Sequence, residues 1–500
     1  MSCIVRQKSG NTVYLYESFS YRDDRGRPRS KRQIVGKLDK DNKPVYNARY
    51  LASLKERGLP MPPKASYSVE EIRASSIKHA GLFYFFSKIA ETTGLFSVLP
   101  EAFPDTWADI FDLSCFLASS GEPMMYCEDW LEKTDAFPAH LSSQDISALL
   151  QKLGGEGQDA FFRLWGTYRR EREYLALDIT SISSYSHFIP DMEHGWDGEK
   201  LPQVNLCMLV GEQSRLPVFR IEYSGSLKDV NTLETTLETI YRISGSKLRL
   251  VMDKGFYSLK NLKTMLKGRK TKGFLISVPF TAGLAKKAVV RSKADAENPE
   301  NAIAWEKQSI QGFTYREELM GKKLYVHVYY NMVKAAERKS GLHTFVGNLL
   351  KHAIKYPDDS KYKDLYDHYL SMGKEKKTGK LQVGINKEAV ALEYRYAGWM
   401  VLASNCCASA EKAIELYRLK DVVEKGFYRL KNCLDTNRLR VHSDTAVRGK
   451  ILISFIALIL QSFVHNVMTV KNMYKDMTMK ELFRQLEKLR VQYICGNRIV

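Results

Sequence analysis

Residues 417–432 have the sequence "YRLKDVVEKGFYRLKN" and carry two different stripes of side chains. At about 100° per residue along a helix, the leucines, the second valine and the phenylalanine of this stretch gather on one side as a core face. Tyr417, Lys420, Glu424 and Lys431 fall at about 0°, 300°, 340° and 320°, on the shoulder of that face. The polar stripe is therefore held close to the core and can still reach a cleft. An ordinary i,i+4 ion pair on a solvated surface is the alternative interpretation.

The composition favours a polyanionic partner. The chain has 500 residues, which is enough for roughly two to four structural units. It has 76 Lys and Arg against 57 Asp and Glu, so its formal net charge is +19, and its sequence pI is about 9.3. The positive charge is spread along the whole sequence, so it is not a detachable basic tail. Charge of this kind predicts a nucleic-acid partner but says nothing about a reaction.

Cysteine usage and hydropathy predict a cytoplasmic protein. The eight cysteines are scattered and none forms a CxxC pair, which is typical of a reducing compartment. The first residues, "MSCIVRQKSGNTVYLYE", contain no apolar signal core. The most apolar run, "ILISFIALIL" at 451–460, is too short to span a bilayer before polar residues follow. We expect it to form a buried helix, and we expect no membrane partner.

The N-terminal region combines a hairpin pattern with a concentrated basic turn. Residues 11–20 alternate as a strand does, and "QIVGKL" at 33–38 can return as a second strand. The intervening "RDDRGRPRSKR" offers Arg25, Arg27 and Arg29 as candidate phosphate contacts. A solvated turn with no ligand is the alternative. Prolines at 59–66 mark a linker, and the sequence from 68 to 165 is predicted to be mostly helical.

The middle of the chain has the pattern of an α/β unit. Between 172 and 280, three strands are followed by a helix, a strand, a second helix and the strand "GFLISVP". This order predicts a mixed sheet with packed helices. Residues 281–394 interrupt the pattern with lysine-rich helical stretches and further strands. Residues 398–405, "GWMVLASN", then form one more predicted strand before the stretch quoted first.

Two aspartates stand at unusual positions for a charge. Asp178 lies in "YLALDITS" and Asp253 in "LRLVMDKGF", each at or just after an apolar strand. A half-buried carboxylate needs a partner, and no zinc-type His/Cys grouping is nearby. Together with Glu424 they would make an oxygen site suited to two Mg²⁺ or Mn²⁺ ions. Singly, a strand-end aspartate is more often structural. Asp229 and Asp421 are weaker alternatives, the first as a capping residue and the second one turn before Glu424.

These segments resemble the motifs of DDE-class transposases of bacterial insertion sequences. The third motif of that family, called YREK, is Tyr, two residues, Arg, three residues, Glu, six residues and Lys. The spacing is matched here by Tyr417, Lys420, Glu424 and Lys431, with lysine where the family usually has arginine. "LDITSISSYS" resembles the first motif and "VMDKGFYSLKNL" the second. The likeness covers roughly 170–470, and "YLYESFSYRDDRGRPRSKRQIVGKL" resembles the start of one branch of the family.

The resemblance implies an α/β fold: a ribonuclease-H-like mixed-sheet core interrupted by an insertion domain, with a β-hairpin plus helical N-terminal region. Asp178, Asp253 and Glu424 would be the catalytic metal ligands. Tyr417, Lys420 and Lys431 would contact DNA phosphates. The separation of 171 residues between Asp253 and Glu424 (424 minus 253) agrees with an insertion. The expected domains are an N-terminal hairpin that contacts DNA (1–60), a helical DNA-end-binding region (61–168), the first part of the catalytic core (169–280), the insertion domain (281–394), the second part of the core (395–470) and a C-terminal helix (471–500).

The function implied is that of a DNA transposase. It would bind the terminal inverted repeats of its element and catalyse metal-dependent cleavage and strand transfer on double-stranded DNA. Its partners would be transposon ends and target DNA, with a dimer assembled on DNA near the bacterial nucleoid. Two Mg²⁺ or Mn²⁺ ions would be the only cofactors, and no small-molecule substrate is expected. A nuclease of the same fold without strand transfer, and a non-catalytic DNA-binding repressor, are the alternatives.

Overall fold

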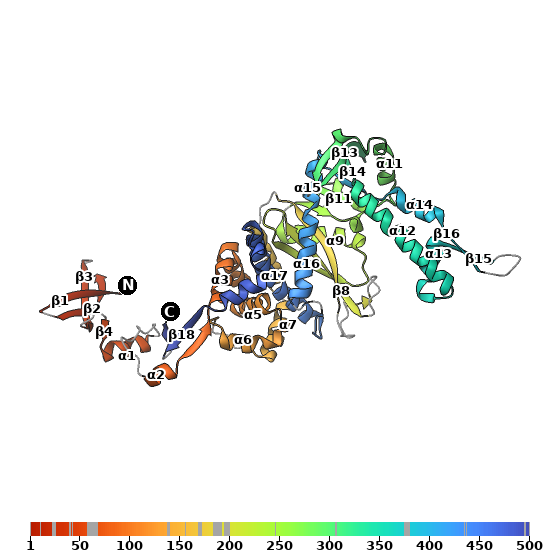
Figure 1. Ribbon diagram of the computed structural model, residues 1–500. Helices are drawn as coiled ribbons and strands as arrows, with labels where there is room; N and C mark the ends of the chain where they lie inside the picture. Colours follow the sequence, from red (N-terminus) through yellow and green to blue (C-terminus); the bar gives the residue numbers. More distant parts are fainter. Residues whose placement is uncertain are drawn as a thin grey trace. The chain divides into compact units, whose positions relative to one another are not determined.

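The chain folds into two compact units, which are described separately below. The first unit consists of Met1–Lys88, Tyr126–His140 and Tyr474–Val500, and the second of Ile89–Met125 and Leu141–Met473. Figure 1 labels the helices and strands. The computed structural model describes the whole chain except residues 1, 11, 23–26, 40–41, 43, 58–68, 138–140, 156, 169–172, 184–192, 195–200, 246, 306–307, 375–380, 435, 437, 495–496 and 500.

A four-stranded antiparallel sheet forms the N-terminal part of the first unit. Its strands are β1 (Ser2–Ser9), β2 (Thr12–Arg22), β3 (Pro28–Leu38) and β4 (Pro44–Tyr46), in that order. The strands β2 and β3 are the two that the sequence pattern predicts. Helix α1 (Ala48–Glu56) follows, and Leu15, Val35 and Leu54 are buried. The predicted hairpin is therefore the central pair of a larger sheet, because β1 and β4 complete its edges.

The C-terminal segment is not the single helix that the sequence analysis expects. Its helix, α18, covers only Met479–Leu486 and begins with a capping box between Thr478 and Glu481. Beyond it, β18 (Arg490–Ile494) pairs with β19 (Asn497–Ile499) and with β5 (Ser76–His79), both antiparallel. The β-branched and aromatic residues of "RVQYI" favour a strand once a distant strand edge is available. The unit also contains α2 (Val69–Arg73) and α6 (Cys127–Lys133), and α3 (Gly81–Thr93) continues from it into the second unit.

A ten-stranded mixed sheet organises the second unit, as the strand pattern predicts. Its order is β12-β13-β14-β17-β11-β10-β6-β8-β7, with β9 pairing with β8. Strand β10 is parallel to both β6 and β11, whereas the other pairs are antiparallel. The bounds are β6 Leu175–Ser183, β7 Glu193–His194, β8 Pro202–Gly211, β9 Pro217–Ser224, β10 Leu248–Met252, β11 Thr271–Ser277, β12 Ala302–Trp305, β13 Gln308–Leu319, β14 Lys322–Tyr330 and β17 Trp399–Ser404.

The sheet continues into the range expected to be an insertion domain. Strand β14 pairs with β17 along its length, and β13 and β12 follow outward from it. Strands β12, β13 and β14 are therefore part of the main sheet. Residues 332–395 instead pack around a hydrophobic cluster of their own that includes Leu342, Val346 and Tyr366. This part, grouped together in Figure 1, contains α12 (Met332–Lys355), α13 (Lys363–Tyr369), β15 (Leu370–Lys374), β16 (Leu381–Ile385) and α14 (Lys387–Arg395).

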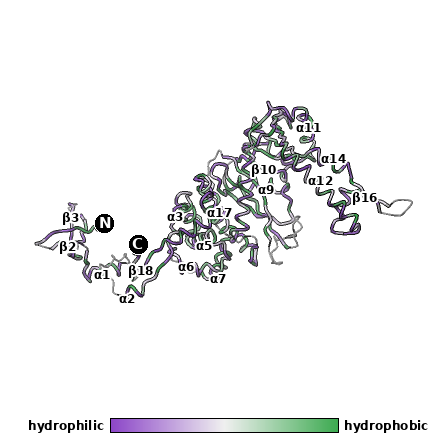
Figure 2. Tube along the Cα trace, in the orientation of Figure 1, coloured by the Kyte–Doolittle hydropathy of each residue, from purple (hydrophilic) through white to green (hydrophobic). Residues whose placement is uncertain are grey.

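Helix α17 (Asp444–Val470) is the buried centre of the helical layer. It packs against α5 (Trp107–Ser120) and α7 (Ser143–Gly155), and the apolar character of α5 and α17 can be followed in Figure 2. In the described part of the chain it is the helix long and apolar enough to cross a membrane, and 78% of its apolar window is buried. The predicted buried helix at 451–460 is thus confirmed. Because α5 and α7 pack on α17, much of the predicted helical region 61–168 belongs to the second unit.

The remaining helices connect or cover the strands of the sheet. Trp165 of α8 is fully buried, and its indole N–H donates to the carbonyl of Pro217 at 2.9 Å, which fixes α8 against β9. The bounds are α4 Leu95–Ala102, α8 Gln158–Thr167, α9 Asp229–Ser244, α10 Leu259–Leu266, α11 Gly283–Ser292, α15 Ala410–Tyr417 and α16 Leu419–Cys433.

Candidate active site

Two neighbouring parallel strands bring Asp178 and Asp253 together. Met252 of β10 is in register with Leu177 of β6, so the next residues of both strands, Asp253 and Asp178, are also neighbours. Asp178 lies in the half-buried middle of β6. Asp253 follows β10 directly in an extended conformation, just before a short 3-10 turn. Both aspartates therefore lie at the same place on the sheet, where a catalytic pair can form.

Helix α16 places Glu424 beside these aspartates. Its buried face contains Leu419, Val423, Gly426, Phe427 and Leu430, as the helical periodicity predicts, and it packs on β6 and β8. The helix approaches the sheet closely at Gly426, where a Cβ atom would lie 3.2 Å from the methyl carbon of Met208 on β8. The predicted helix is interrupted at Arg418, which separates α15 from α16. The Arg418 guanidinium stacks over the Trp305 ring at 4.2 Å.

A single ammonium group bridges two of the three carboxylates. The Lys420 Nζ atom is 2.9 Å from Oδ2 of Asp253 and 2.9 Å from Oε1 of Glu424. The Tyr417 hydroxyl donates to the other oxygen of Asp253, Oδ1, at 3.0 Å. Each oxygen of Asp253 thus accepts a hydrogen bond from the polar stripe that the sequence analysis identified. The contacts with Asp253 exclude the interpretation that this stripe is only a solvated surface.

The two aspartates differ in their electrostatics. The pKa of Asp178 is raised to about 6, chiefly by burial and to a smaller extent by the charges of Asp253 and Glu424, whereas the Ile179 backbone N–H and Lys420 lower it. Burial also raises the pKa of Asp253, but its hydrogen bonds from Lys420, the Lys254 backbone and Tyr417 outweigh burial and lower it overall. The charges of Asp253 and Glu424 both act on Asp178, so the three carboxylates lie near enough to interact. A site of this kind is suited to binding positive charge.

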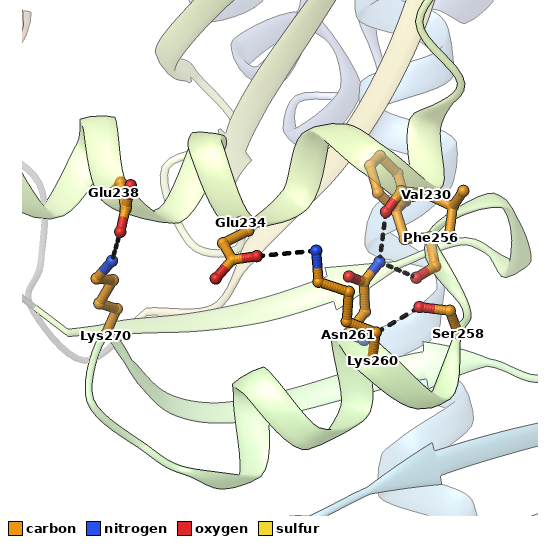
Figure 3. Close-up of polar contacts among 8 residues, drawn as sticks. All are labelled: Val230, Glu234, Glu238, Phe256, Ser258, Lys260, Asn261 and Lys270. Carbon is orange, nitrogen blue, oxygen red and sulfur yellow. Dashed lines mark hydrogen bonds and ion pairs between the residues drawn. The ribbon is translucent and has the colours of Figure 1, made fainter.

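Asn261 fixes the segment that follows Asp253, as Figure 3 shows. Its side-chain amide donates to the carbonyl of Val230 at 2.8 Å and to that of Phe256 at 2.8 Å. Its backbone N–H donates to the Ser258 hydroxyl, which caps α10. One buried side chain therefore ties the turn after Asp253 to the first turn of α9. Sequence reasoning missed this residue, and the only available signal was a polar residue on the apolar face of the helix "LKNLKTML".

Asp229, the weaker alternative ligand, also lies near this site. Burial raises its pKa, and the charge of Asp253 raises it further. It borders a cavity of about 510 Å³ that Ile179, Asn205 and Gly255 also line. The other alternative, Asp421, is exposed. The structure thus gives Asp229 a place beside the carboxylates that its sequence context did not indicate.

The remaining predicted residues lie away from this cluster or are not described. Lys431 is on α16, seven residues after Glu424, which corresponds to about 10 Å along a helix. Arg27 and Arg29 are exposed residues of the first unit, at the end of the β2–β3 hairpin. Arg25 lies outside the described residues. The structure therefore brings together Asp178, Asp253, Glu424, Tyr417 and Lys420.

The three carboxylates supply the type of oxygen ligand that a hard divalent cation prefers. Three carboxylate side chains lie near one another, and the charges of Asp253 and Glu424 add to the effect of burial in raising the pKa of Asp178. In the present arrangement, however, an ammonium group stands between Asp253 and Glu424. Among the residues that the structure describes, no three His, Cys, Asp or Glu side chains are close enough to hold a metal ion. The donor set suits a metal, and the conformation is one in which lysine supplies the positive charge.

The fold and site define an α/β protein in which a cluster of carboxylates lies on a mixed sheet. Residues 169–460 match the family model described as "Transposase DDE domain". The match covers more than half of the chain and contains all three carboxylates, and the chain belongs to this family. It is therefore a transposase of the DDE type, a nuclease-type enzyme of DNA transposition.

The chain can also be compared with solved structures and with curated proteins. Among solved structures, the chain is similar to a cryo-EM structure of the piggyBac transposase synaptic complex with hairpin DNA. The sequence identity is 12%, the TM-score is 0.34, and the match covers 87% of this chain and 74% of that chain. A comparison with curated proteins found no match.

Proposed function

We propose that this transposase cuts the terminal inverted repeats of a bacterial insertion sequence and joins them to target DNA, with Asp178, Asp253 and Glu424 as its catalytic residues. The observation that carries the proposal is the convergence of these carboxylates from β6, β10 and α16 around Lys420. All three lie within the residues matched by the family model. The spacing of Tyr417, Lys420, Glu424 and Lys431 assigns the chain to the YREK type, with lysine in place of arginine.

The strand order supports a ribonuclease-H-like core. Strands β9, β8, β6, β10 and β11 are consecutive in the sheet, and only the pairs β6–β10 and β10–β11 in this series are parallel. Residues 169–280 and 395–470 supply this core and the catalytic helix. We assign the insertion to the part between them, in which residues 332–395 have a hydrophobic cluster of their own.

Each residue of the site has a defined part in the proposed reaction. Asp178, Asp253 and Glu424 would hold two Mg²⁺ or Mn²⁺ ions, which when bound favour in-line attack of an oxygen nucleophile on a phosphodiester. Tyr417 orients Asp253 through its hydroxyl. Lys420 and Lys431 contribute positive charge for DNA phosphates along one helix.

Residues of both units take part in DNA recognition in this proposal. Arg25, Arg27 and Arg29 belong to a basic stretch of sequence suited to phosphate contacts, and the helices within 61–168 would contact the transposon end. Cutting two ends together requires a dimer on DNA. The net charge of +19 supports a double-stranded DNA partner and an association with the bacterial nucleoid.

The test is a cleavage and joining reaction with the full chain. A duplex ending in the element's inverted repeat is incubated with Mg²⁺ and a target plasmid, and both nicking and joining are followed on denaturing gels. We expect metal-dependent cuts at the repeat end and joining of the new 3′ ends to the plasmid, and both should stop when EDTA removes the metal. Cutting without joining would support a nuclease instead, and end binding without cutting would support a repressor.

A further inference from the structure

The position of Lys420 has a consequence for metal binding. Its Nζ atom is within 2.9 Å of one oxygen of Asp253 and one oxygen of Glu424, and its side chain is 20% exposed. Contacts to two carboxylates at this distance are charge-assisted hydrogen bonds. The ammonium group thus neutralises part of the negative charge that these carboxylates and Asp178 create together.

A metal ion and this ammonium group compete for the same oxygens. Mg²⁺ holds its oxygen ligands at about 2.0–2.1 Å and requires them in a near-octahedral arrangement. Lys420 keeps Asp253 and Glu424 at the longer contact distance of an ammonium ion. Two cations bound to the same pair of carboxylates would also repel each other strongly in a partly buried site.

We propose that Lys420 is the resident cation of the metal-free site and that a divalent metal ion displaces its ammonium group, which then becomes available to a DNA phosphate. The inference rests on the proposed function, because it requires that the carboxylates bind metal. In this exchange Lys420 changes partners when metal binds. In the two other roles open to it, Lys420 would either orient the carboxylates permanently or contact only DNA.

The chemistry of lysine suits such an exchange. Its charge is a compact ammonium on a flexible four-carbon chain, so it can move without breaking a planar, two-point contact of the arginine kind. Lys420 lies one helical turn before Glu424, so a rotation of its side chain is enough to leave the carboxylate. Asp253 would keep its contact with Tyr417 during the exchange.

The test measures Mn²⁺ binding to the full chain without DNA, by the electron paramagnetic resonance signal of free Mn²⁺. We expect Lys420→Met to bind Mn²⁺ about tenfold more tightly than the wild type, because a competing charge-assisted contact is lost. Lys420→Arg keeps the competing charge and should stay within about threefold of the wild type. The matched control is Lys425→Met, which removes the same charge from an exposed position of the same helix and should also stay within about threefold.

Weaker or unchanged Mn²⁺ binding in Lys420→Met would overturn the exchange and leave the carboxylate site standing. If neither the wild type nor Lys420→Met bound Mn²⁺, both the exchange and the proposed metal site would be overturned. Circular dichroism checks that the variants are folded, and Lys420→Gln serves as a second neutral variant with the same expected tightening. A second readout is the effect of a short duplex, which should tighten Mn²⁺ binding more in the wild type than in Lys420→Met.

Discussion

Asn261 uses one side-chain amide to join two segments next to Asp253. We expect Asn261→Ala to lower the free energy of unfolding by about 1–3 kcal/mol, because the buried carbonyls of Val230 and Phe256 lose their common donor. Cleavage should fall as well, since the turn after Asp253 is no longer fixed to α9. Urea unfolding and the cleavage reaction measure the two effects.

The matched control is Lys260→Ala, one residue earlier in the same helix. Lys260 pairs with Glu234, as Figure 3 shows. The N–O distance is 3.2 Å, but the side chain of Lys260 is 79% exposed. An exposed ion pair contributes little, so this variant should stay within about 0.5 kcal/mol of the wild type. Equal behaviour of the two variants would show that Asn261 has no special part in positioning Asp253.

The buried His327 should make the free energy of unfolding depend on pH. It is fully buried on β14, with Nδ1 hydrogen-bonded to Thr314 and Nε2 to the Cys407 carbonyl. Burial lowers its pKa from 6.5 to about 4. The folded state keeps the His327 ring neutral, whereas the unfolded state takes up a proton below pH 6.5. The contribution of the neutral ring to the free energy of unfolding is therefore complete above pH 6.5 and is lost as the pH falls from 6.5 towards 4.

We therefore expect the wild type to lose about 2 kcal/mol between pH 7.5 and pH 5 through His327. The measurement is urea unfolding at both pH values for the wild type and for His327→Gln, which has no titrating ring. His465, whose pKa burial and nearby arginine and lysine charges also lower, is present in both proteins and cancels in the comparison. An identical pH dependence of the wild type and His327→Gln would exclude His327 as the cause of the loss of stability at pH 5.

Single residues of the site could be predicted where their own short segment marks them, as the strand-end positions of Asp178 and Asp253 do. The spacing of Tyr417, Lys420 and Glu424 follows from helical geometry, so their common stripe was predictable. Their contact with Asp253 was not, because Tyr417 and Asp253 are 164 positions apart and no periodicity reports on such a pair. Asn261 was missed for a related reason, since its partners only become visible in three dimensions.

At the scale of elements, a substitution in α17 tests whether this helix stabilises the second unit. Phe455 is 2% exposed and makes an edge-to-face contact with Phe162 of α8, with ring centroids 5.4 Å apart. We expect Phe455→Ala to destabilise the protein by about 3–5 kcal/mol, because a large buried side chain is replaced by a cavity. Val470→Ala, at the 73% exposed end of the same helix, is the control and should have little effect. Urea unfolding measures the free energy of unfolding of both variants. A decrease of less than about 1 kcal/mol for Phe455→Ala would argue against a central role of α17 in stability.

Elements were predictable from the sequence when their pattern was local. The alternation and apolar runs of β6, β8, β10 and β11 identified these strands, and the ten apolar residues of 451–460 identified the buried helix. Partners were harder to predict. Strand β14 was expected in an insertion, but its edge pairs with β17. Strand β18 was expected as helix, but it pairs with β5 over 400 positions earlier. In both cases the deciding interaction is a backbone ladder between distant segments.

At the scale of the whole molecule, the net charge of +19 predicts salt-dependent DNA binding. Each phosphate contact contributes about 0.9 to the slope of log K against log salt. We expect the double variant Arg27→Ala/Arg29→Ala to reduce the slope by about 1.8 if both residues contact phosphates. The control is Arg338→Ala, because Arg338 pairs with Glu393 at 3.3 Å. Filter binding at several salt concentrations gives the slopes, and an unchanged slope in the double variant would remove the N-terminal arginines from the interface.

The most direct test of the central claim compares Asp178→Asn, Asp253→Asn and Glu424→Gln with the wild type in Mg²⁺-dependent cleavage of the element's end. Each substitution keeps the size of the side chain and removes its negative charge. Asp421→Asn, an exposed change on the same helix as Glu424, is the matched control. We predict that the three carboxylate variants lose cleavage by at least about a thousandfold and retain end binding, whereas Asp421→Asn cuts as the wild type does. Cleavage at the wild-type rate in any of the three variants would contradict the assignment of that carboxylate to the catalytic site.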